Sequence, residues 1–122
     1  MPGQIAARNV RLKRAYRPAA ADDGVRILVD RLWPRGVKKS EAAIDRWIKD
    51  IAPSTALRKW FAHDPARWPE FRRRYAAEVR GRPDLLAELR AIVRKGPVTL
   101  VFAARDELRN DAVVLRNVLL GR

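Results

Sequence analysis

The chain has 122 residues, no cysteine, and 27 Lys and Arg against 14 Asp and Glu, for a formal net charge of +13. Its length fits one domain with a modest core, and the lack of cysteine excludes disulfides, thiolate metal sites and cysteine nucleophiles. No apolar run approaches the ~18 residues of a membrane span, and residues 1–8 lack the apolar core of a secretory signal. We therefore expect a cytoplasmic protein that does not contact a membrane.

The positive charge has two interpretations. It predicts attraction to polyanions, but a high net charge also keeps a protein soluble, and abundant Arg and Ala is what codon usage in a GC-rich genome produces. Codon usage explains Arg in place of Lys and leaves the net charge itself unexplained, because that exchange alters no charge. Both a functional role and a solubility role of the basic surface stay open.

The first part of the chain predicts two strands. We expect a flexible segment over residues 1–9, followed by one α/β domain over residues 10–122. Val10–Tyr16 alternates apolar and polar residues, the pattern of a half-buried strand. After Pro18–Gly24, which has the composition of a turn, Val25–Val29 predicts a more apolar second strand.

Three helices are predicted in the middle of the chain. Ser40 can cap the first, whose apolar residues recur at i, i+3, i+4 and i+7: Ile44, Trp47, Ile48 and Ile51. Pro53 ends it, and Ser54 can cap a short second helix with the apolar face Leu57, Trp60 and Phe61. The third, over about residues 66–80, points Trp68, Phe71, Tyr75 and Val79 inward and Arg72, Arg73 and Arg80 largely outward.

The remainder predicts a helix, a strand and a last helix. Pro83 suits a first helical turn, and Gly96-Pro97 is a conventional stop. Val98–Phe102 is a continuous apolar run, typical of a strand buried on both faces of a parallel sheet. Asn110 can cap a final helix that buries Val114, Leu115, Val118 and Leu119. This order predicts an α/β fold with a small, mostly parallel three-stranded sheet covered by about five helices.

The segment after the second strand is the most informative part of the sequence. Asp30–Lys39 holds one carboxylate, two guanidiniums, an indole and two ammoniums, which neither a strand nor a helix requires. If the second and last strands are parallel neighbours, loops 30–39 and 103–110 face each other at the edge where open α/β sheets hold ligands. We therefore expect a ligand-binding site made of Asp30, Arg31, Trp33, Arg35, Gly36, Lys38, Arg105 and Asn110.

Asp30 and Trp33 also have purely structural interpretations. Asp30 is a weak catalytic candidate as a general base or a metal ligand, but it can instead pair with Arg31 or Arg35, or cap loop amides. Trp33 can stack against a base, or it can close the core.

Anion binding is most credible at Arg35 and Gly36. Arg offers a planar fork of donors, and Gly lets the backbone approach an oxyanion closely. Lys38 and Lys39 are more simply explained as part of a solvated loop.

The remaining candidates favour structural roles. His63, the only imidazole, can form an acid–base dyad with Asp64, but its place between a short helix and Pro65 favours a helix-end role. Ser54 is explained as a cap without invoking a nucleophile. One His with scattered carboxylates has no metal-ligand spacing, so we expect neither a metal nor a cofactor.

Two segments carry a family resemblance. Leu28–Gly36, followed by Ala52–Phe61, closely resembles the short bacterial YeaO-like family, known as domain of unknown function 488. The resemblance covers nearly the whole chain after residue 9 and continues through His63-Asp64-Pro65, Trp68, Phe71, Arg74-Tyr75 and Val98-Thr99-Leu100. It implies a compact α/β protein without an established reaction.

The chain departs from the family pattern before the last helix. Relatives similar to it tend to have Lys-Asp and then Asn-His, where this chain has Arg105-Asp106 and Asn110-Asp111. The carboxylate at Asp111 argues against a family-wide catalytic histidine at that position.

Three functions of different classes fit these observations. The first is a binding module for an anionic ligand, either nucleic acid or a phosphorylated small molecule. The second is an enzyme on such a ligand, with Asp30 as base and Arg35 or Arg105 stabilising negative charge. The third is a basic protein-interaction module. Helix-turn-helix, P-loop and dinucleotide-binding motifs are absent from the sequence, and no feature of it sets an oligomeric state.

Overall fold

The computed structural model describes residues 5–122, and residues 1–4 lie outside the described part. The expected flexible segment over residues 1–9 therefore falls partly outside it. In the described remainder, Ile5 packs against the main core and Arg116 donates from Nη2 to the Ala7 carbonyl at 3.0 Å.

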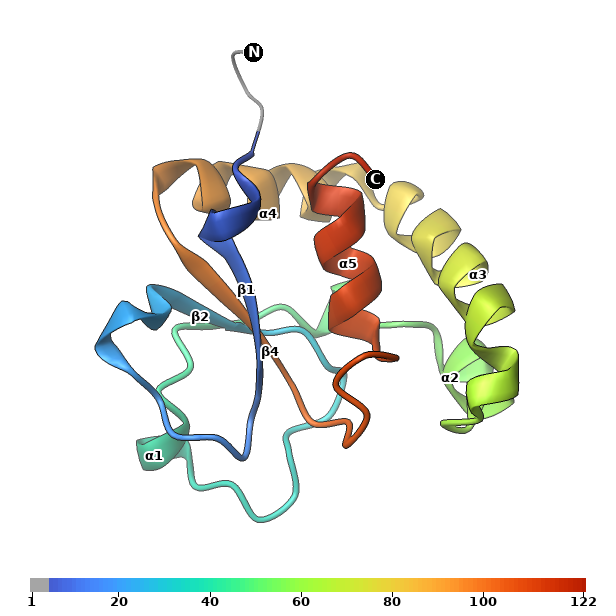
Figure 1. Cartoon of the computed structure of the whole chain (residues 1–122), viewed down its shortest axis with the longest axis horizontal. Helices are drawn as coiled ribbons and strands as arrows, with labels where there is room; N and C mark the ends of the chain where they lie inside the picture. The colour runs from blue at the N-terminus through green and yellow to red at the C-terminus, as the bar shows by residue number, and fades with distance from the viewer. Residues whose placement is uncertain (1–4) are drawn as a thin grey trace.

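Within residues 5–122, four parallel strands form one sheet in the order β1-β4-β2-β3 (Figure 1). They are β1 (Val10–Arg14), β2 (Val25–Leu28), β3 (Arg46–Trp47) and β4 (Val98–Phe102). All five residues of β4 are buried, as expected for a strand covered on both faces. Because β2 and β4 are parallel neighbours, the loops that follow them leave the same edge of the sheet, at the bottom of Figure 1.

The third strand corrects the predicted helix after Ser40. That segment forms only the four-residue α1 (Lys39–Ala42), then β3 and a 3-10 turn over Lys49–Ile51. The reason is the open edge of β2, whose carbonyls need donors: Asp45 N–H donates to the Arg26 carbonyl at 2.9 Å and Ile48 N–H to the Leu28 carbonyl at 3.0 Å. The sheet therefore has four strands instead of three.

The apolar spacing in this segment is real but does not mark one helix face. Ile44 and Trp47 pack with the cluster on one side of the sheet, while Ile48 and Ile51 enter the main core on the other. Apolar residues can thus recur with a period near 3.6 even when they pack against opposite faces of a sheet.

The other predicted helices are confirmed. They are α2 (Thr55–Phe61), α3 (Trp68–Arg80), α4 (Pro83–Lys95) and α5 (Asp111–Leu119). The Ser54 hydroxyl accepts from Leu57 N–H at 3.2 Å, and the Asn110 side-chain carbonyl accepts from Val113 N–H at 3.0 Å, so both predicted caps form.

The helices after β3 cover one face of the sheet. Alternate residues of β2 and β4, such as Ile27 and Leu100, join the main core with the apolar faces of α2 to α5. On the opposite face, Leu28 and Val101 form a second cluster with Ala15, against which Trp33, Val37, Ile44 and Trp47 pack. The charged segment after β2 therefore serves partly as the cover of the sheet.

A buried ionic network completes this second face. Asp23 and Arg26 are each 3% exposed, and Arg26 Nη1 donates to Asp23 Oδ2 at 2.6 Å. Lys13 donates from Nζ to Asp23 Oδ1 at 2.8 Å, and Arg26 also donates from Nη2 to the Ala42 carbonyl at 2.9 Å. The network links β1, β2 and the end of α1.

Candidate functional site

A cavity of about 800 Å³ opens at the carboxyl edge of the sheet. Its walls come from the loops after β1, β2 and β4 and from the region around α2. This volume lies within the ~300–1,000 Å³ range of pockets that hold small ligands. The expected meeting of loops 30–39 and 103–110 is thus confirmed, and it produces a cavity.

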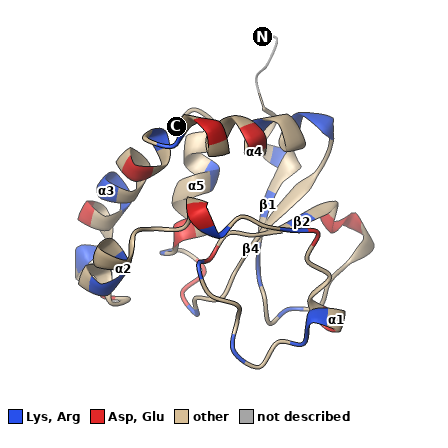
Figure 2. Cartoon of the chain, turned by 180° about the vertical axis from the view of Figure 1, so that it is seen from behind, with Lys and Arg blue, Asp and Glu red and all other residues tan. Residues whose placement is uncertain are grey.

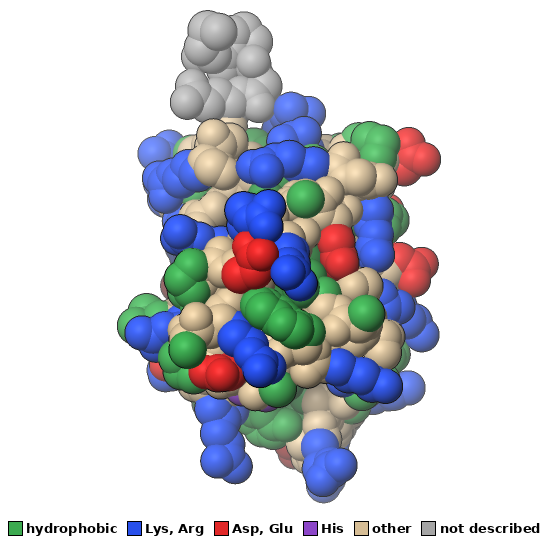
Figure 3. Space-filling view, turned by 90° about the vertical axis from the view of Figure 1, so that its right-hand side faces the viewer, with side chains coloured by type: hydrophobic (Ala, Val, Ile, Leu, Met, Phe, Trp, Pro, Cys, Tyr) green, Lys and Arg blue, Asp and Glu red, His purple; other side chains and the backbone are tan. Residues whose placement is uncertain are grey.

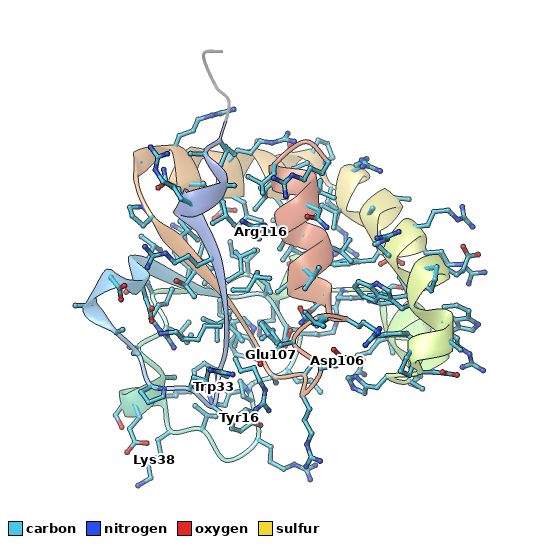
Figure 4. The ribbon with its side chains drawn as sticks, in the orientation of Figure 1. Tyr16, Trp33, Lys38, Asp106, Glu107 and Arg116 are labelled. Atoms are coloured by element: carbon cyan, nitrogen blue, oxygen red, sulfur yellow. The ribbon has the colours of Figure 1, made fainter. Side chains whose placement is uncertain are left out.

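Hydrogen bonds tie the cavity loops to one another. Asp30 Oδ2 accepts from Ala103 N–H at 2.9 Å and so bridges the loops after β2 and β4. Tyr16, in the loop after β1, donates its hydroxyl to the Arg35 carbonyl at 2.9 Å. Figure 4 shows Tyr16 and Trp33 close to this edge, with Asp106 and Glu107 on the neighbouring loop. The cavity is therefore lined by segments that hold one another in place.

Two carboxyl groups meet inside the cavity. Asp111 lies in the first turn of α5 beside Asp30, and its Oδ1 accepts from Ala112 N–H at 2.9 Å. Burial raises the pKa of the Asp111 carboxyl well above its ordinary value, and the neighbouring Asp30 carboxyl raises it further. Both causes favour the neutral form of the Asp111 carboxyl.

The Asp111→Asn variant should be more stable than the wild type at pH 7. An Asp whose pKa is raised by folding is penalised as pH rises above its unfolded value near ~3.9, so the wild type loses stability from there toward neutral pH. Asn keeps the acceptor for Ala112 N–H and has no charge to lose. We therefore expect the variant to be the more stable at pH 7, by a margin that grows as pH rises above the unfolded pKa.

Urea unfolding from pH 3.5 to pH 8 measures this difference. The gain should shrink toward zero at the acid end of the series, and a gain that is constant with pH would contradict the raised pKa of Asp111.

Four guanidiniums line the cavity without an acidic partner among residues 5–122: Arg31, Arg35, Arg58 and Arg105. Arg31 is half-buried, and its Nε is fully buried with no hydrogen-bond partner in the described part of the chain. A fifth, Arg109, is paired with Asp106 at 3.1 Å. On α3, outside the cavity, Glu70 pairs with both Arg73 and Arg74, and Figure 2 shows acidic and basic segments together on this helix.

Trp33 serves as a structural wall of the cavity. Its Nε1 donates to the Val37 carbonyl at 2.7 Å, and its ring meets Trp47 edge-on with centroids 5.6 Å apart. Lys39 Nζ lies 5.8 Å from the ring centroid. This is the core-closing interpretation of the indole, although one side of the residue also lines the cavity.

The eight residues predicted for the site fall into two groups in the structure, those that line the cavity and those that do not. Six line the cavity: Asp30, Arg31, Trp33, Arg35, Arg105 and Asn110. Gly36 and Lys38 are exposed and outside its lining, and Lys38 points outward at the lower left of Figure 4. The Asn110 side-chain amide has a structural role: its Nδ2 donates to the Asp106 carbonyl at 3.0 Å, and its oxygen caps α5.

Asp30 does not form the ion pair with Arg31 or Arg35 that the sequence left open. Within residues 5–122 it instead caps a loop amide, that of Ala103, and contacts Asp111. One of its two structural interpretations is therefore realised.

Sequence reasoning did not include Arg58, His63 or Asp111 in the site. His63 adopts a left-handed backbone with φ of 57° directly after α2, which agrees with a helix-end role, yet it also lines the cavity. Arg58 and His63 lie in or beside the segments that carry the family resemblance. For Arg58 and His63, this overlap was the sequence signal that could have placed them in the site. For Asp111, the signal was the departure from the family pattern.

The fold and this cavity define a class: a small α/β protein with a parallel sheet and a cationic pocket at its carboxyl edge. Residues 9–122 match the family described as "Inactive DUF488-N3 subclade". The chain is 45% identical over 111 residues to "Uncharacterized protein YeaO" of Escherichia coli (strain K12), covering 91% of this chain and 96% of that protein.

Two further relatives come from mycobacteria: "Uncharacterized protein Rv3073c" of Mycobacterium tuberculosis (strain ATCC 25618 / H37Rv) and "Uncharacterized protein Mb3100c" of Mycobacterium bovis (strain ATCC BAA-935 / AF2122/97). Each is 44% identical over 113 residues, covering 93% of this chain and 95% of the relative. No solved structure matches. The chain therefore belongs to the YeaO-like DUF488 family.

Two absences hold for residues 5–122. None of their helices has the length and apolar character needed to cross a bilayer. No group of three or more His, Asp or Glu side chains in this part of the chain is placed to hold a metal ion.

Proposed function

We propose that the protein binds an anionic, phosphate-bearing ligand in the cavity at the carboxyl edge of its sheet. The observation that carries this proposal is Arg31, whose Nε is buried beside the cavity with no partner among the described residues. A buried donor left unpaired costs about 1–3 kcal/mol, and a phosphate or carboxylate oxygen would remove that cost. Arg35, Arg58 and Arg105 would add three further cations around the same ligand.

A binding role is better supported than a catalytic one. Asp30, the candidate base, already accepts a hydrogen bond from Ala103 N–H and lies beside the Asp111 carboxyl, so fewer of its lone pairs are free to take a proton from a substrate. The word "Inactive" in the description of the matching subclade also favours binding without turnover for this chain.

A basic protein-interaction module is the second candidate. Among residues 5–122, the large hydrophobic side chains that are exposed are Tyr16, Leu32 and Leu108, and each lies in a loop after β1, β2 or β4. Lys and Arg side chains are spread over the face in Figure 3 from top to bottom and outnumber the acidic ones there, which suits an acidic partner. The cavity favours a ligand smaller than such a partner.

Titration calorimetry with inorganic pyrophosphate tests the binding proposal. Arg31→Ala should weaken binding about ten- to hundredfold, because it removes charge-assisted hydrogen bonds worth ~1.5–3 kcal/mol. The matched control is Arg72→Ala, which removes an exposed guanidinium of α3 that has no partner among the described residues and lies outside the cavity lining. Its effect should be at most about twofold.

Melting temperatures of both variants separate a binding defect from a folding defect. Equal losses in Arg31→Ala and Arg72→Ala would mean that the overall positive field attracts anions and that the cavity does not. No pyrophosphate binding by the wild type at low salt would overturn the proposal. A salt series with single-stranded DNA then reports whether nucleic acid binds, since log affinity falls linearly with log salt when phosphate contacts release counterions.

A further inference from the structure

The cavity holds two kinds of unused polar groups side by side. Outside the cavity, several acidic and basic side chains pair with each other, as in Arg17–Glu107 and Arg46–Glu88. In the cavity, Asp30 and Asp111 form no ion pair within residues 5–122, although unpaired guanidiniums line the same space. A ligand that matches both must carry hydrogen-bond donors at one end and negative charge at the other.

The carboxyl pair presents acceptors to the cavity. Asp30 Oδ2 is held by Ala103 N–H and Asp111 Oδ1 by Ala112 N–H, each at 2.9 Å, which fixes both groups in orientation. Both residues line the cavity, and carboxylate oxygens are hydrogen-bond acceptors. The matching ligand edge must therefore offer N–H donors.

The two ends of the cavity differ in how exposed their lining residues are. Arg35, Arg58 and Arg105 are exposed and form its rim, whereas the carboxyl pair is partly buried deeper in. Phe61 and Phe71, both buried, supply aromatic wall with their rings stacked at 4.2 Å between centroids. Because the two rings stack on each other, they form one aromatic wall of the cavity, against which a flat unsaturated ring can pack.

We propose that the cavity binds a guanine nucleotide, with the base edge on Asp30 and Asp111 and the phosphate on the arginines. This rests on the proposed function and names its ligand class. Guanine presents N1–H and the N2 amine as two adjacent donors. Adenine and cytosine present a donor beside an acceptor on the same edge, and that acceptor would face a carboxylate oxygen. The nucleotide comes either as a free molecule or as part of a single strand.

Titration calorimetry on the full chain distinguishes these cases, with GMP, AMP and ribose 5-phosphate as probes. GMP should bind at least about tenfold more tightly than either, because its two extra hydrogen bonds go to a charged acceptor. In Asp111→Asn the GMP preference should fall to about twofold or less, with ribose 5-phosphate affinity retained. Glu107→Gln is the matched control: it removes an exposed carboxylate of the loop just before α5, outside the cavity lining, and it should keep the preference.

The outcomes separate this inference from the proposed function. Equal affinity for GMP, AMP and ribose 5-phosphate, all weakened in Arg31→Ala, would overturn the guanine inference and leave anion binding in place. No binding of any phosphate, pyrophosphate included, would overturn both. A short thymidine single strand with and without one guanine tests the polymer source: a guanine preference there, lost in Asp111→Asn, supports the base site on a nucleic acid even when free GMP binds poorly.

Discussion

The Asp23→Ala variant should lose about 3–5 kcal/mol of folding free energy, because it leaves the buried guanidinium of Arg26 without its charge partner. Arg26 is 3% exposed, and its Nη1 donates to Asp23 Oδ2 at 2.6 Å. Lys13 and the Ala20 N–H would lose the same acceptor. For a protein of this size such a loss is a large share of the total stability. Urea unfolding at pH 7 measures it.

Asp22→Ala is the matched control one residue away. The Asp22 side chain is 77% exposed and pairs with Arg11, which is itself 45% exposed, so its removal should cost at most about 1 kcal/mol. Similar losses in the two variants would contradict the role given to the buried network.

The acid end of the unfolding series gives a second test of Asp23. Burial alone would raise the pKa of this carboxyl, but hydrogen bonds from Lys13, Ala20 N–H and Arg26 outweigh it and lower the pKa below its ordinary value. Its stabilising contribution is therefore present above the unfolded pKa of ~3.9 and is lost as pH falls through the folded pKa. The Asp23→Ala variant should lack this part of the acid-induced loss, and an unchanged acid slope would argue against it.

Gly24→Ala should destabilise the fold by at least about 3 kcal/mol. Gly24 has φ of 66° and ψ of −142°, a conformation that is essentially restricted to glycine and costs other residues ~1–3 kcal/mol. A Cβ there would also lie 2.1 Å from the Pro97 carbonyl oxygen, an overlap that requires movement worth a further ~1–3 kcal/mol. That carbonyl accepts from Val25 N–H at 3.0 Å, so moving it disturbs the start of the β2–β4 ladder.

Gly36→Ala separates the two causes. Gly36 has φ of 78°, but no atom lies within 4 Å of an added Cβ, so only the backbone penalty of ~1–2 kcal/mol should appear. Thermal unfolding of both variants measures the difference. If Gly24→Ala cost no more than Gly36→Ala, the close approach to Pro97 would not matter.

Local signals in the sequence were sufficient for most of the fold. Helix caps such as Ser54 and Asn110 depend on side chains within three residues of the amides they bind, so they can be recognised without knowing the rest of the molecule. The apolar run Val98–Phe102 identified the central strand for the same kind of reason, since a strand buried on both faces has no polar face to interrupt it. The parallel pairing of β2 and β4 then placed two charged loops at one edge.

The segment after Ser40 shows where such reasoning stops. The spacing of its apolar residues depends on which residues are buried, but it does not show which face of the sheet each one packs against. Ile44 and Ile48, which lie on opposite faces of the sheet, therefore resembled one face of a helix. The strand forms because β2 has an unpaired edge, and that edge exists only once the sheet has assembled.

The sequence by itself determined the α/β class, the helices after Pro53, and the presence of a charged site after the second strand. Only the tertiary structure decided the contents of that site. Asp111 and Arg58 join it because the start of α5 and the helix α2 reach the same sheet edge. Arg31 is left without a partner because Asp30 accepts from Ala103 and lies beside Asp111 instead. Partner choice among charged groups depends on distances between segments far apart in the chain, and sequence spacing does not contain those distances.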